Sequence, residues 1–361
     1  MDNYREVSLL PIKAVGASGT ETIDIAVDEP LTSLYVYFRA TNEAAVAKDV
    51  PPEHCIDKIE IVDGGQVYWS TSGPEAVAAS VYEVGRWPSH FYNEGASAGQ
   101  FSLIPLNFGR YLGDEEFMFS PTKLLNPQLK ISWTHNALHL STGYTLGVRV
   151  KAMQGVTPGS KALMVKNIRT FTTAASGIEG TDLPVDLDYR RLFVRAYHAN
   201  FFWVSMLTHL KLDCDVGKRI VFDISAARFL DMVRETFPDF NIQMQTTCDS
   251  NIWHEAWMGN VDAASLAYGT GGIIGDAWTA SAGRWQSIAA TDAGALTTGQ
   301  VASVSLRGWL PQTTLCYQFG RADDPTSWFK AARYGQVKLE LTQGSAGKSL
   351  GILLQRPIAL P

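Results

Sequence analysis

The chain has little charge, and it lacks any long run of one sign. Only 18% of its 361 residues are charged, against about a quarter in typical soluble domains. Neither end carries a cluster of Lys or Arg that could neutralise phosphates, so the sequence argues against direct, sequence-specific nucleic-acid binding. Because 46% of the residues are hydrophobic, the chain can bury large cores while leaving little charged surface. That balance suits a protein covered by neighbouring subunits.

Targeting and cysteine signatures are also missing. The segment Met1–Glu6 is acidic where a signal peptide needs positive charge, and no apolar run is long enough to cross a bilayer. The sequence therefore predicts a soluble chain made in the host cytoplasm. No C-x-x-C pair exists, which argues against zinc and redox motifs. We expect buried free thiols at the four positions Cys55, Cys214, Cys248 and Cys316.

Catalytic motifs are absent as well. The sequence has no G-x-S-x-G elbow, and the segment 344–349 (GSAGKS) is one residue short of the Walker spacing, so we interpret it as a turn between strands. His135 and His139 have an H-x3-H spacing, but they lie between a predicted strand and Gly143, where a turn is favoured over a helical metal site. We therefore predict no catalytic residue, no metal site, no cofactor and no enzymatic activity.

Two groups of residues keep other functions open. Paired acids could serve glycoside hydrolysis or calcium binding, although Asp in a turn commonly accepts hydrogen bonds from its own backbone. The candidates for hydrolysis are Asp323 with Asp324, Glu115 with Glu116, and Asp213 with Asp215, and calcium binding concerns only the two aspartate pairs. Tryptophans suit either a subunit interface or a sugar-binding platform. Four of them lie in one glycine-rich range: Trp253, Trp257, Trp278 and Trp285. A carbohydrate-binding double β-sandwich is therefore the alternative function.

The chain repeats itself at an offset of 158 residues. Residues 16–42 align without a gap to residues 174–200, with ten identities in 27 positions. Two or three would be expected by chance for this composition. Such self-similarity indicates a tandem duplication of one structural unit.

Later elements recur in the same order. Residues 59–69 and 210–222 both alternate around a glycine turn, which predicts β-hairpins. A short helix is predicted after each hairpin. The first covers Pro74–Val84, with Val77, Val81 and Val84 on one face. The second covers Ser225–Phe237, with Phe229, Val233 and Phe237 on one face. The offset then grows to just over 200, which places about fifty extra residues of the second copy in the range 243–300. We expect this range to be a large insertion loop that makes contacts.

Short alternating segments separated by Gly, Pro, Asn or Asp indicate an all-β protein. We predict two tandem eight-stranded antiparallel jelly rolls with short inserted helices. The first is expected to cover residues 1–158. The second is expected to cover 159–361, with the insertion at about 243–300. A generic Greek-key sandwich stays open at this point, because periodicity does not give the strand order.

The organisation of the chain resembles the double jelly-roll major capsid proteins of tailless icosahedral viruses of bacteria, archaea and eukaryotes. The resemblance rests on the tandem copies, the helix after the early hairpin, the insertion in the second copy, and residues 104–112 and 126–131. It implies a structural viral capsid protein located in the virion. It also implies a homotrimer that forms pseudo-hexameric capsomers of an icosahedral shell. The implied partners are neighbouring capsomers, minor capsid or vertex proteins, and an internal lipid membrane beneath the shell.

Overall fold

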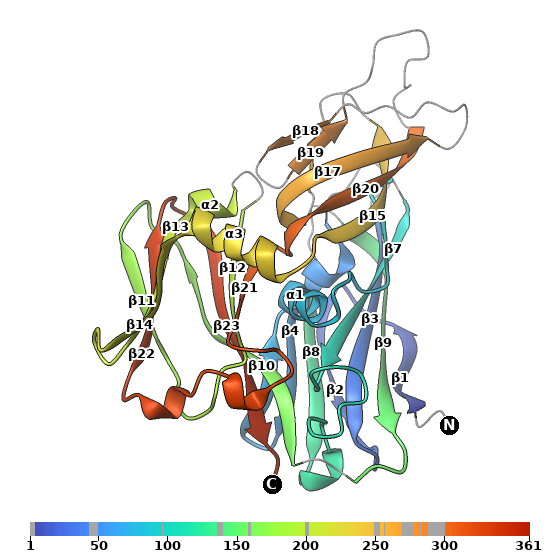
Figure 1. The fold of residues 1–361 in the computed structure, drawn as a ribbon. Coiled ribbons are helices and arrows are strands. Elements are labelled where there is room, and N and C mark those ends of the chain that lie inside the picture. The colour runs from blue at the N-terminus through green and yellow to red at the C-terminus, as the bar shows by residue number, and fades with distance from the viewer. Residues whose placement is uncertain are drawn as a thin grey trace.

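The structure is a computed structural model that places two β-sandwiches side by side, with a third β-rich region above them (Figure 1). It describes residues 4–42, 50–95, 97–135, 140–157, 160–198, 202–248, 253–255, 257–268, 278–281, 284–287 and 300–361.

The first sandwich consists of two facing four-stranded sheets, β1-β9-β3-β7 and β2-β8-β4-β5, with the short β6 added beside β7. Its strands are β1 (Tyr4–Ala14), β2 (Ser18–Asp24), β3 (Leu31–Asn42), β4 (Ile56–Asp63), β5 (Gln66–Thr71), β6 (His90–Asn93), β7 (Gly99–Asn107), β8 (Pro127–Thr134) and β9 (Leu140–Met153). Its helices are η1 (Pro52–Cys55), α1 (Gly73–Val84) and η2 (Pro121–Lys123).

The second sandwich repeats this arrangement with the sheets β10-β23-β12-β21 and β11-β22-β13-β14. Its strands are β10 (Lys161–Thr172), β11 (Ile178–Leu183), β12 (Arg191–Tyr197), β13 (Leu207–Cys214), β14 (Arg219–Ser225), β21 (Thr314–Gln318), β22 (Val337–Gln343) and β23 (Ser349–Ala359). Its helices are α2 (Trp203–Met206), α3 (Ala226–Thr236), η3 (Pro325–Ser327) and η4 (Ala331–Arg333).

The two sandwiches have the same strand order when their eight main strands are counted along each copy. The first, eighth, third and sixth strands form one sheet, and the second, seventh, fourth and fifth form the other. This is the jelly-roll order, so the prediction of two tandem eight-stranded jelly rolls is confirmed.

The register repeats as well. Tyr35 in β3 lies opposite Arg149 in β9. In the second copy Phe193 in β12 lies opposite Leu353 in β23. Tyr35 and Phe193 differ by the 158 residues of the sequence offset, so the repeat found in the sequence is also a repeat of strand pairing.

Helices α1 and α3 begin at equivalent serine caps. Ser72 accepts a hydrogen bond from the backbone of Glu75, whose side chain accepts one in return from the backbone of Ser72, and Ser225 caps α3 in the same position. One detail of the predicted apolar face was wrong, because Val84 at the end of α1 is exposed.

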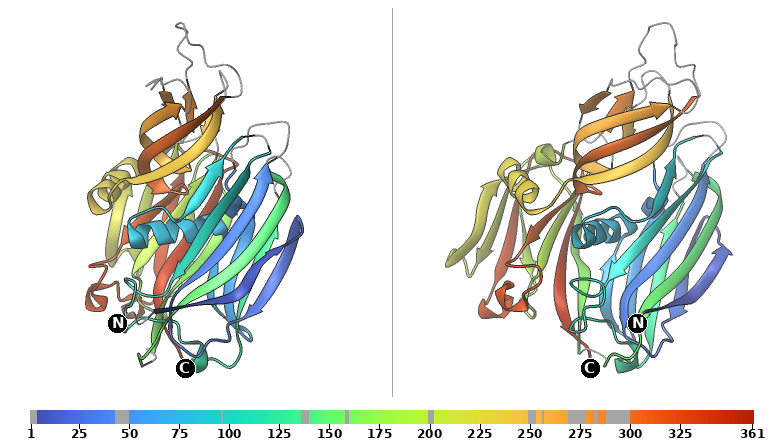
Figure 2. Two further views of the ribbon diagram at one scale, coloured as in Figure 1. Left: turned by 90° about the vertical axis from the view of Figure 1, so that its right-hand side faces the viewer. Right: turned by 45° about the vertical axis from the view of Figure 1, so that its right-hand side comes forward.

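The segment between α3 and β21 differs from the predicted loop, because its described residues form strands. They are β15 (Phe240–Cys248), β16 (Trp253–Glu255), β17 (Met258–Tyr268), β18 (Trp278–Ser281), β19 (Arg284–Ser287) and β20 (Gln300–Pro311). Strand β15 pairs in parallel with β6, so the first jelly roll's sheet continues through β15, β20 and β17 into this upper region (Figure 2). The insertion therefore adds to the sheet of the first jelly roll, although it interrupts the sequence of the second.

One large hydrophobic cluster extends through both jelly rolls and the base of the insertion. The predicted burial of the thiols is confirmed at Cys55, Cys214 and Cys316, which are buried and not joined in disulfides. The side chain of Cys248 lies outside the described residues.

Candidate assembly surface

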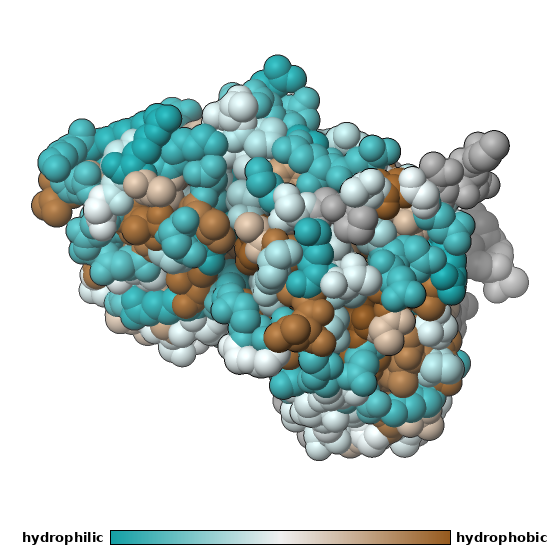
Figure 3. Space-filling view, turned by 90° about the horizontal axis from the view of Figure 1, so that it is seen from below, coloured by the Kyte–Doolittle hydropathy of each residue, from teal (hydrophilic) through white to brown (hydrophobic). Residues whose placement is uncertain are grey.

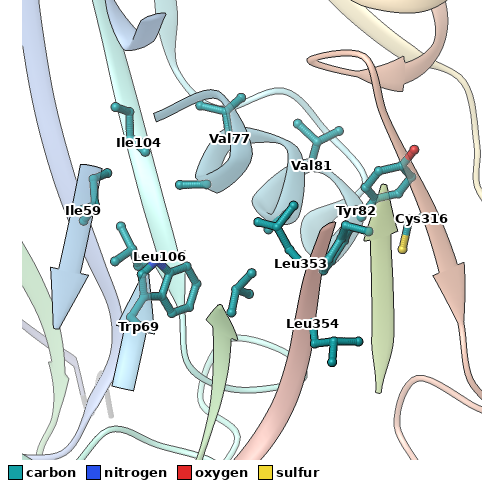
Figure 4. Packing of buried hydrophobic residues seen from close by; sticks show 14 of the residues in the cluster. Ile59, Trp69, Val77, Val81, Tyr82, Ile104, Leu106, Cys316, Leu353 and Leu354 are labelled. Carbon is teal, nitrogen blue, oxygen red and sulfur yellow. The ribbon is translucent and has the colours of Figure 1, made fainter. Parts of the chain in front are cut away.

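Helix α1 of the first jelly roll lies against the outer face of the second. We use "second outer face" for the side chains of the β10-β23-β12-β21 sheet that point away from its own sandwich: Arg191, Phe193, Cys316, Leu353 and Gln355. Tyr82 of α1 reaches this face, where its ring lies 6.1 Å from the ring of Phe193 and its hydroxyl donates to the carbonyl of Thr314 at 2.6 Å. Figure 4 shows Tyr82 beside Leu353 and Cys316. Burial raises the pKa of the Cys316 thiol to about 12.

A buried charge cluster joins the same two surfaces. The carboxylate of Glu83 accepts hydrogen bonds from Arg190 at 2.8 Å and from Arg191 at 2.7 Å, and these three side chains are at most 4% exposed. Burial alone would raise the pKa of Glu83, but the guanidinium groups of Arg191 and Arg190 hold it below its ordinary value. The carboxylate is therefore charged at neutral pH and fixes the end of α1 on the second jelly roll.

The other end of α1 is held in a similar way. The amide of Asn167 in β10 donates to Glu75 at 2.8 Å. A Cβ atom at Gly351 would lie 2.8 Å from the Glu75 carboxylate, so a side chain there would push this carboxylate away. Strands β5 and β10 also pair in parallel at Ser70 and Lys166. The two jelly rolls are thus joined by strand pairing, a helix and buried charge.

A second buried network fixes the base of the insertion to the first jelly roll. Glu53 accepts hydrogen bonds from the Tyr92 hydroxyl at 2.6 Å, from the Gln312 amide at 2.8 Å, and from Ser102. The oxygen of the same Gln312 amide lies 2.8 Å from His54 Nε2. Burial raises the pKa of Glu53 and lowers that of His54 to about 3, so the His54 ring is neutral.

The described residues cover the equivalent face of the first jelly roll only in part. We use "first outer face" for the equivalents of the five residues above: Ser33, Tyr35, Pro105, Arg149 and Lys151. The side chain of Leu353 in the second copy is fully buried, whereas that of its equivalent Arg149 is 51% exposed. Two hollows of about 390 and 660 Å³ lie on this face, and Tyr35 and Arg149 line both of them. Seen from below, hydrophobic residues form separate patches on both jelly rolls (Figure 3).

Several of the acids singled out in the sequence accept hydrogen bonds from backbone amides. The carboxylate of Asp213 accepts a hydrogen bond from the backbone amide of Gly217, and that of Asp215 accepts one from the backbone amide of Gly335. Asp324 caps η3 by accepting from the amide of Thr326. Glu115 and Glu116 are exposed, and Arg110 pairs with Glu116, while the exposed Asp323 pairs with Arg321. The expected turn at 344–349 is confirmed between β22 and β23.

The histidine and tryptophan predictions have mixed outcomes. His135 lies 2.7 Å from the Tyr144 hydroxyl, and His139 lies outside the described residues. Trp257 is buried beneath the insertion, with its ring 4.2 Å from that of His54 and stacked on Tyr197. It is therefore not a surface platform for a sugar. The side chains of the other three tryptophans of the insertion lie outside the described residues.

The described part of the chain contains no group of three His, Cys, Asp or Glu side chains placed to hold a metal ion. No helix in this part is long and apolar enough to span a membrane.

Comparison with solved structures identifies the class of fold. The STIV major capsid protein matches 99% of this chain and 97% of its own, with a TM-score of 0.61 and 10% identity. The major capsid protein P2 of bacteriophage PM2 matches 99% and 98%, with a TM-score of 0.56 and 10% identity. The PBCV-1 virus capsid matches 98% and 93%, with a TM-score of 0.57 and 11% identity. The chain therefore has the fold of the double jelly-roll major capsid proteins.

Comparisons of the sequence itself gave no match. No family model fits the chain, and no curated protein matches it. The likeness is thus one of fold along nearly the whole chain.

Sequence reasoning missed the residues that join the two jelly rolls. Glu83 looks like an exposed acid at the end of an amphipathic helix, and its partners Arg190 and Arg191 follow more than a hundred positions later. One signal was available, since two adjacent arginines stand in the second copy where the first has Thr32 and Ser33. A charged pair at the start of a predicted central strand indicates a buried ionic partner.

Proposed function

We propose that this chain is a structural viral major capsid protein whose homotrimer forms a pseudo-hexameric capsomer of an icosahedral shell. The observation that supports this most is the match in fold, over nearly the full length of each chain, to the major capsid proteins of STIV and PM2. A single domain fold supports many functions, but here two fused jelly rolls and the insertion are matched together.

The internal junction supports a mechanical role. Strand pairing, helix α1 and the Glu83 cluster hold the two jelly rolls in one orientation, so each chain contributes two rigid units to an assembly. We divide these units at residues 1–158 and 159–361. The proposed location is the virion, and the proposed function is not enzymatic.

The proposed partners are neighbouring capsomers, minor capsid or vertex proteins, and an internal lipid membrane under the shell. The formal net charge of −6 suits a shell that does not bind the genome sequence-specifically. The carbohydrate-binding alternative is not favoured, because the matching structures are capsid proteins and Trp257 is buried.

Native mass spectrometry of the purified full chain tests the proposal. We expect a species of three chains at micromolar concentration, and electron microscopy should show capsomers of hexagonal outline. A chain that stays monomeric over a wide range of salt and concentration contradicts the proposed function.

A further inference from the structure

Residues 309–313, which we call the neck, lead from β20 of the insertion back into the second jelly roll at β21. Leu310, Gln312 and Thr313 have φ angles of 59°, 50° and 56°. This left-handed region is costly for residues other than glycine, and most costly for a β-branched residue such as Thr313. Three of the seven non-glycine residues with positive φ in the described part of the chain thus lie within four consecutive positions, so backbone strain is concentrated in the neck.

The neck also buries polar atoms without a partner. The hydroxyl of Thr313 and the indole nitrogen of Trp309 are buried, and neither makes a hydrogen bond within the described residues. A buried donor without a partner destabilises the fold, because it loses its hydrogen bonds to water and gains none in return. Thr313 therefore combines an unfavourable backbone with an unfavourable side chain. Such local conflicts persist in natural chains chiefly where a segment has a second role.

One side-chain amide holds the neck in this conformation. Gln312 donates from Nε2 to Glu53 at 2.8 Å, and its Oε1 lies 2.8 Å from Nε2 of His54. The amide oxygen can only accept, so the neutral His54 ring donates this second hydrogen bond. Both partners belong to η1 of the first jelly roll, and Gln312 is almost completely buried.

The backbone of the neck is bonded elsewhere. Nε of Arg195 in β12 donates to the carbonyl of Gln312 at 3.2 Å, and the amide of Ala196 donates to the carbonyl of Thr313 at 3.2 Å. The Tyr82 hydroxyl of α1 donates to the next carbonyl, that of Thr314. The neck is thus anchored through its backbone at β12 and α1, and through a side chain at η1.

Trp257 is a fourth strained residue in contact with the neck. Its φ angle is 53°, and its carbonyl accepts a hydrogen bond from the backbone amide of Gln312 at 2.8 Å. Its ring packs against His54 of the first jelly roll and Tyr197 of the second. The start of β17 and the neck are therefore bonded directly to each other, and a movement of one moves the other.

A short seam between β6 and β15 is the other link from the insertion to the first jelly roll. Its two residue pairs are Met244 with Tyr92 and Gln245 with Asn93. The amide of Glu94 adds a hydrogen bond to the carbonyl of Gln245 at 2.9 Å. Within the insertion, by contrast, β15 pairs with β20 through nine residue pairs. The sheet of the insertion is therefore held together much more extensively than it is held to the first jelly roll (Figure 2).

We propose that the neck is a hinge and that Gln312 is its latch, so that the insertion swings as one unit away from the first jelly roll when the amide leaves η1 and the seam opens. Opening relaxes the strained backbone of Leu310, Gln312 and Thr313, which offsets part of the loss of these contacts. The two jelly rolls stay in place, because strand pairing and the Glu83 cluster join them independently of the insertion.

The hinge goes beyond the proposed function and does not depend on it. In a shell, it would let two rigid jelly rolls keep their positions while the insertion adjusts to different neighbours. A chain that never assembles contradicts the capsid function and leaves the hinge intact. The tests of the hinge therefore use the unassembled full-length chain.

Glycine substitutions at two adjacent threonines test the strain. The readout is hydrogen–deuterium exchange of residues 90–95, because the amide of Glu94 loses its partner when the seam opens. Thr313→Gly removes the strained β-branched side chain and its unpaired hydroxyl, so we expect exchange to slow at least about threefold. Thr314→Gly is the matched control. Thr314 lies in β21 without a positive φ, and its hydroxyl donates to the carbonyl of Gln312 at 3.2 Å, so exchange should become faster. Faster exchange in both variants means that the neck is flexible and unstrained, and it overturns the hinge.

Replacing Gln312 tests the latch. Gln312→Ala removes two buried hydrogen bonds, so exchange of residues 90–95 should speed up at least about tenfold. Exchange in β3 and β23, in the cores of the two jelly rolls, should stay as in the wild type. Gln128→Ala in β8 is the control, since its amide donates to Asp24 far from the insertion in the sequence, and it should leave residues 90–95 unchanged. If Gln312→Ala speeds exchange everywhere equally, or nowhere, Gln312 is not a latch.

A disulfide across the seam tests the movement itself. Asn93 and Gln245 are paired in register, and the amide of Asn93 donates to the side-chain oxygen of Gln245 at 3.0 Å, so cysteines at these positions can be bridged. We expect oxidised Asn93→Cys/Gln245→Cys in the Gln312→Ala background to recover the slow exchange of the wild type, and reduction to abolish the recovery. Equally fast exchange in the oxidised and reduced proteins contradicts a movement of the insertion away from the first jelly roll.

Discussion

Replacing Glu83 with Gln tests how the two jelly rolls are held together. The substitution keeps the size of the side chain but leaves Arg190 and Arg191 buried without their shared negative partner. Breaking a buried ion pair by removing one partner costs about 3–5 kcal/mol. Because Gln keeps one acceptor oxygen, we expect a loss near 3 kcal/mol from the free energy of unfolding.

Urea unfolding, followed by both tryptophan fluorescence and circular dichroism, measures this loss and resolves any separate unfolding of the two jelly rolls. Glu29→Gln is the control, because it removes a partner of Arg5 in an ion pair whose Arg side chain is 51% exposed. Such surface pairs contribute about 0.2–1 kcal/mol. If Glu83→Gln destabilises the chain no more than Glu29→Gln does, the cluster does not hold the junction.

The same carboxylate predicts a pH dependence. Since the pKa of Glu83 is below its ordinary value of 4.5 in the folded chain, its stabilisation is fully present above that value and is lost as the pH falls below it. The difference in unfolding free energy between wild type and Glu83→Gln should therefore shrink between neutral and acidic pH. A difference that stays constant on acidification contradicts the assignment of a charged Glu83.

Three further predictions concern the insertion and the two outer faces. Because the pKa of Glu53 is raised, its contribution to the free energy of unfolding is present at acidic pH and is lost as the pH rises through that pKa. Glu53→Gln should therefore remove this pH-dependent contribution from unfolding curves measured at a series of pH values. Trp257→Ala should cost about 3–5 kcal/mol in urea unfolding, because the ring is buried at the base of the insertion. Leu353→Ala should lower the free energy of unfolding by about 2–5 kcal/mol, because this side chain is buried. The equivalent substitution Arg149→Ala should change the free energy of unfolding of the unassembled chain by at most about 0.5 kcal/mol. Equal effects at both positions would contradict the difference in burial between the two faces.

Much of the fold could be predicted because duplication leaves a pattern that repeats along the chain. The offset of 158 residues locates β3 and β12, and alternation into a glycine turn locates the hairpins. Serine caps mark the starts of both helices, since a capping hydrogen bond involves neighbouring residues. These signals are local, and they do not depend on how the sandwiches pack.

The junctions could not be predicted in the same way. Glu53 and Gln312 bond to each other across 259 residues, and nothing near either position shows the partner. Strand β15 pairs with β6 through only two residue pairs, so no extended pattern marks that the insertion joins the sheet of the first jelly roll. Glu83 lies at the end of an apolar helix, a position where an acid is usually exposed. It is buried here because the second jelly roll covers it.

The two equivalent outer faces differ in polarity. A surface covered by the same chain is never exposed once folding is complete, so Phe193 and Leu353 on the second outer face can be apolar. Before assembly, the equivalent surface of the first jelly roll must stay in water, where a large apolar patch would promote aggregation. Arg149 in place of Leu353 meets that demand. The difference between Leu353 and Arg149 therefore distinguishes the face that the chain itself covers from its more exposed equivalent.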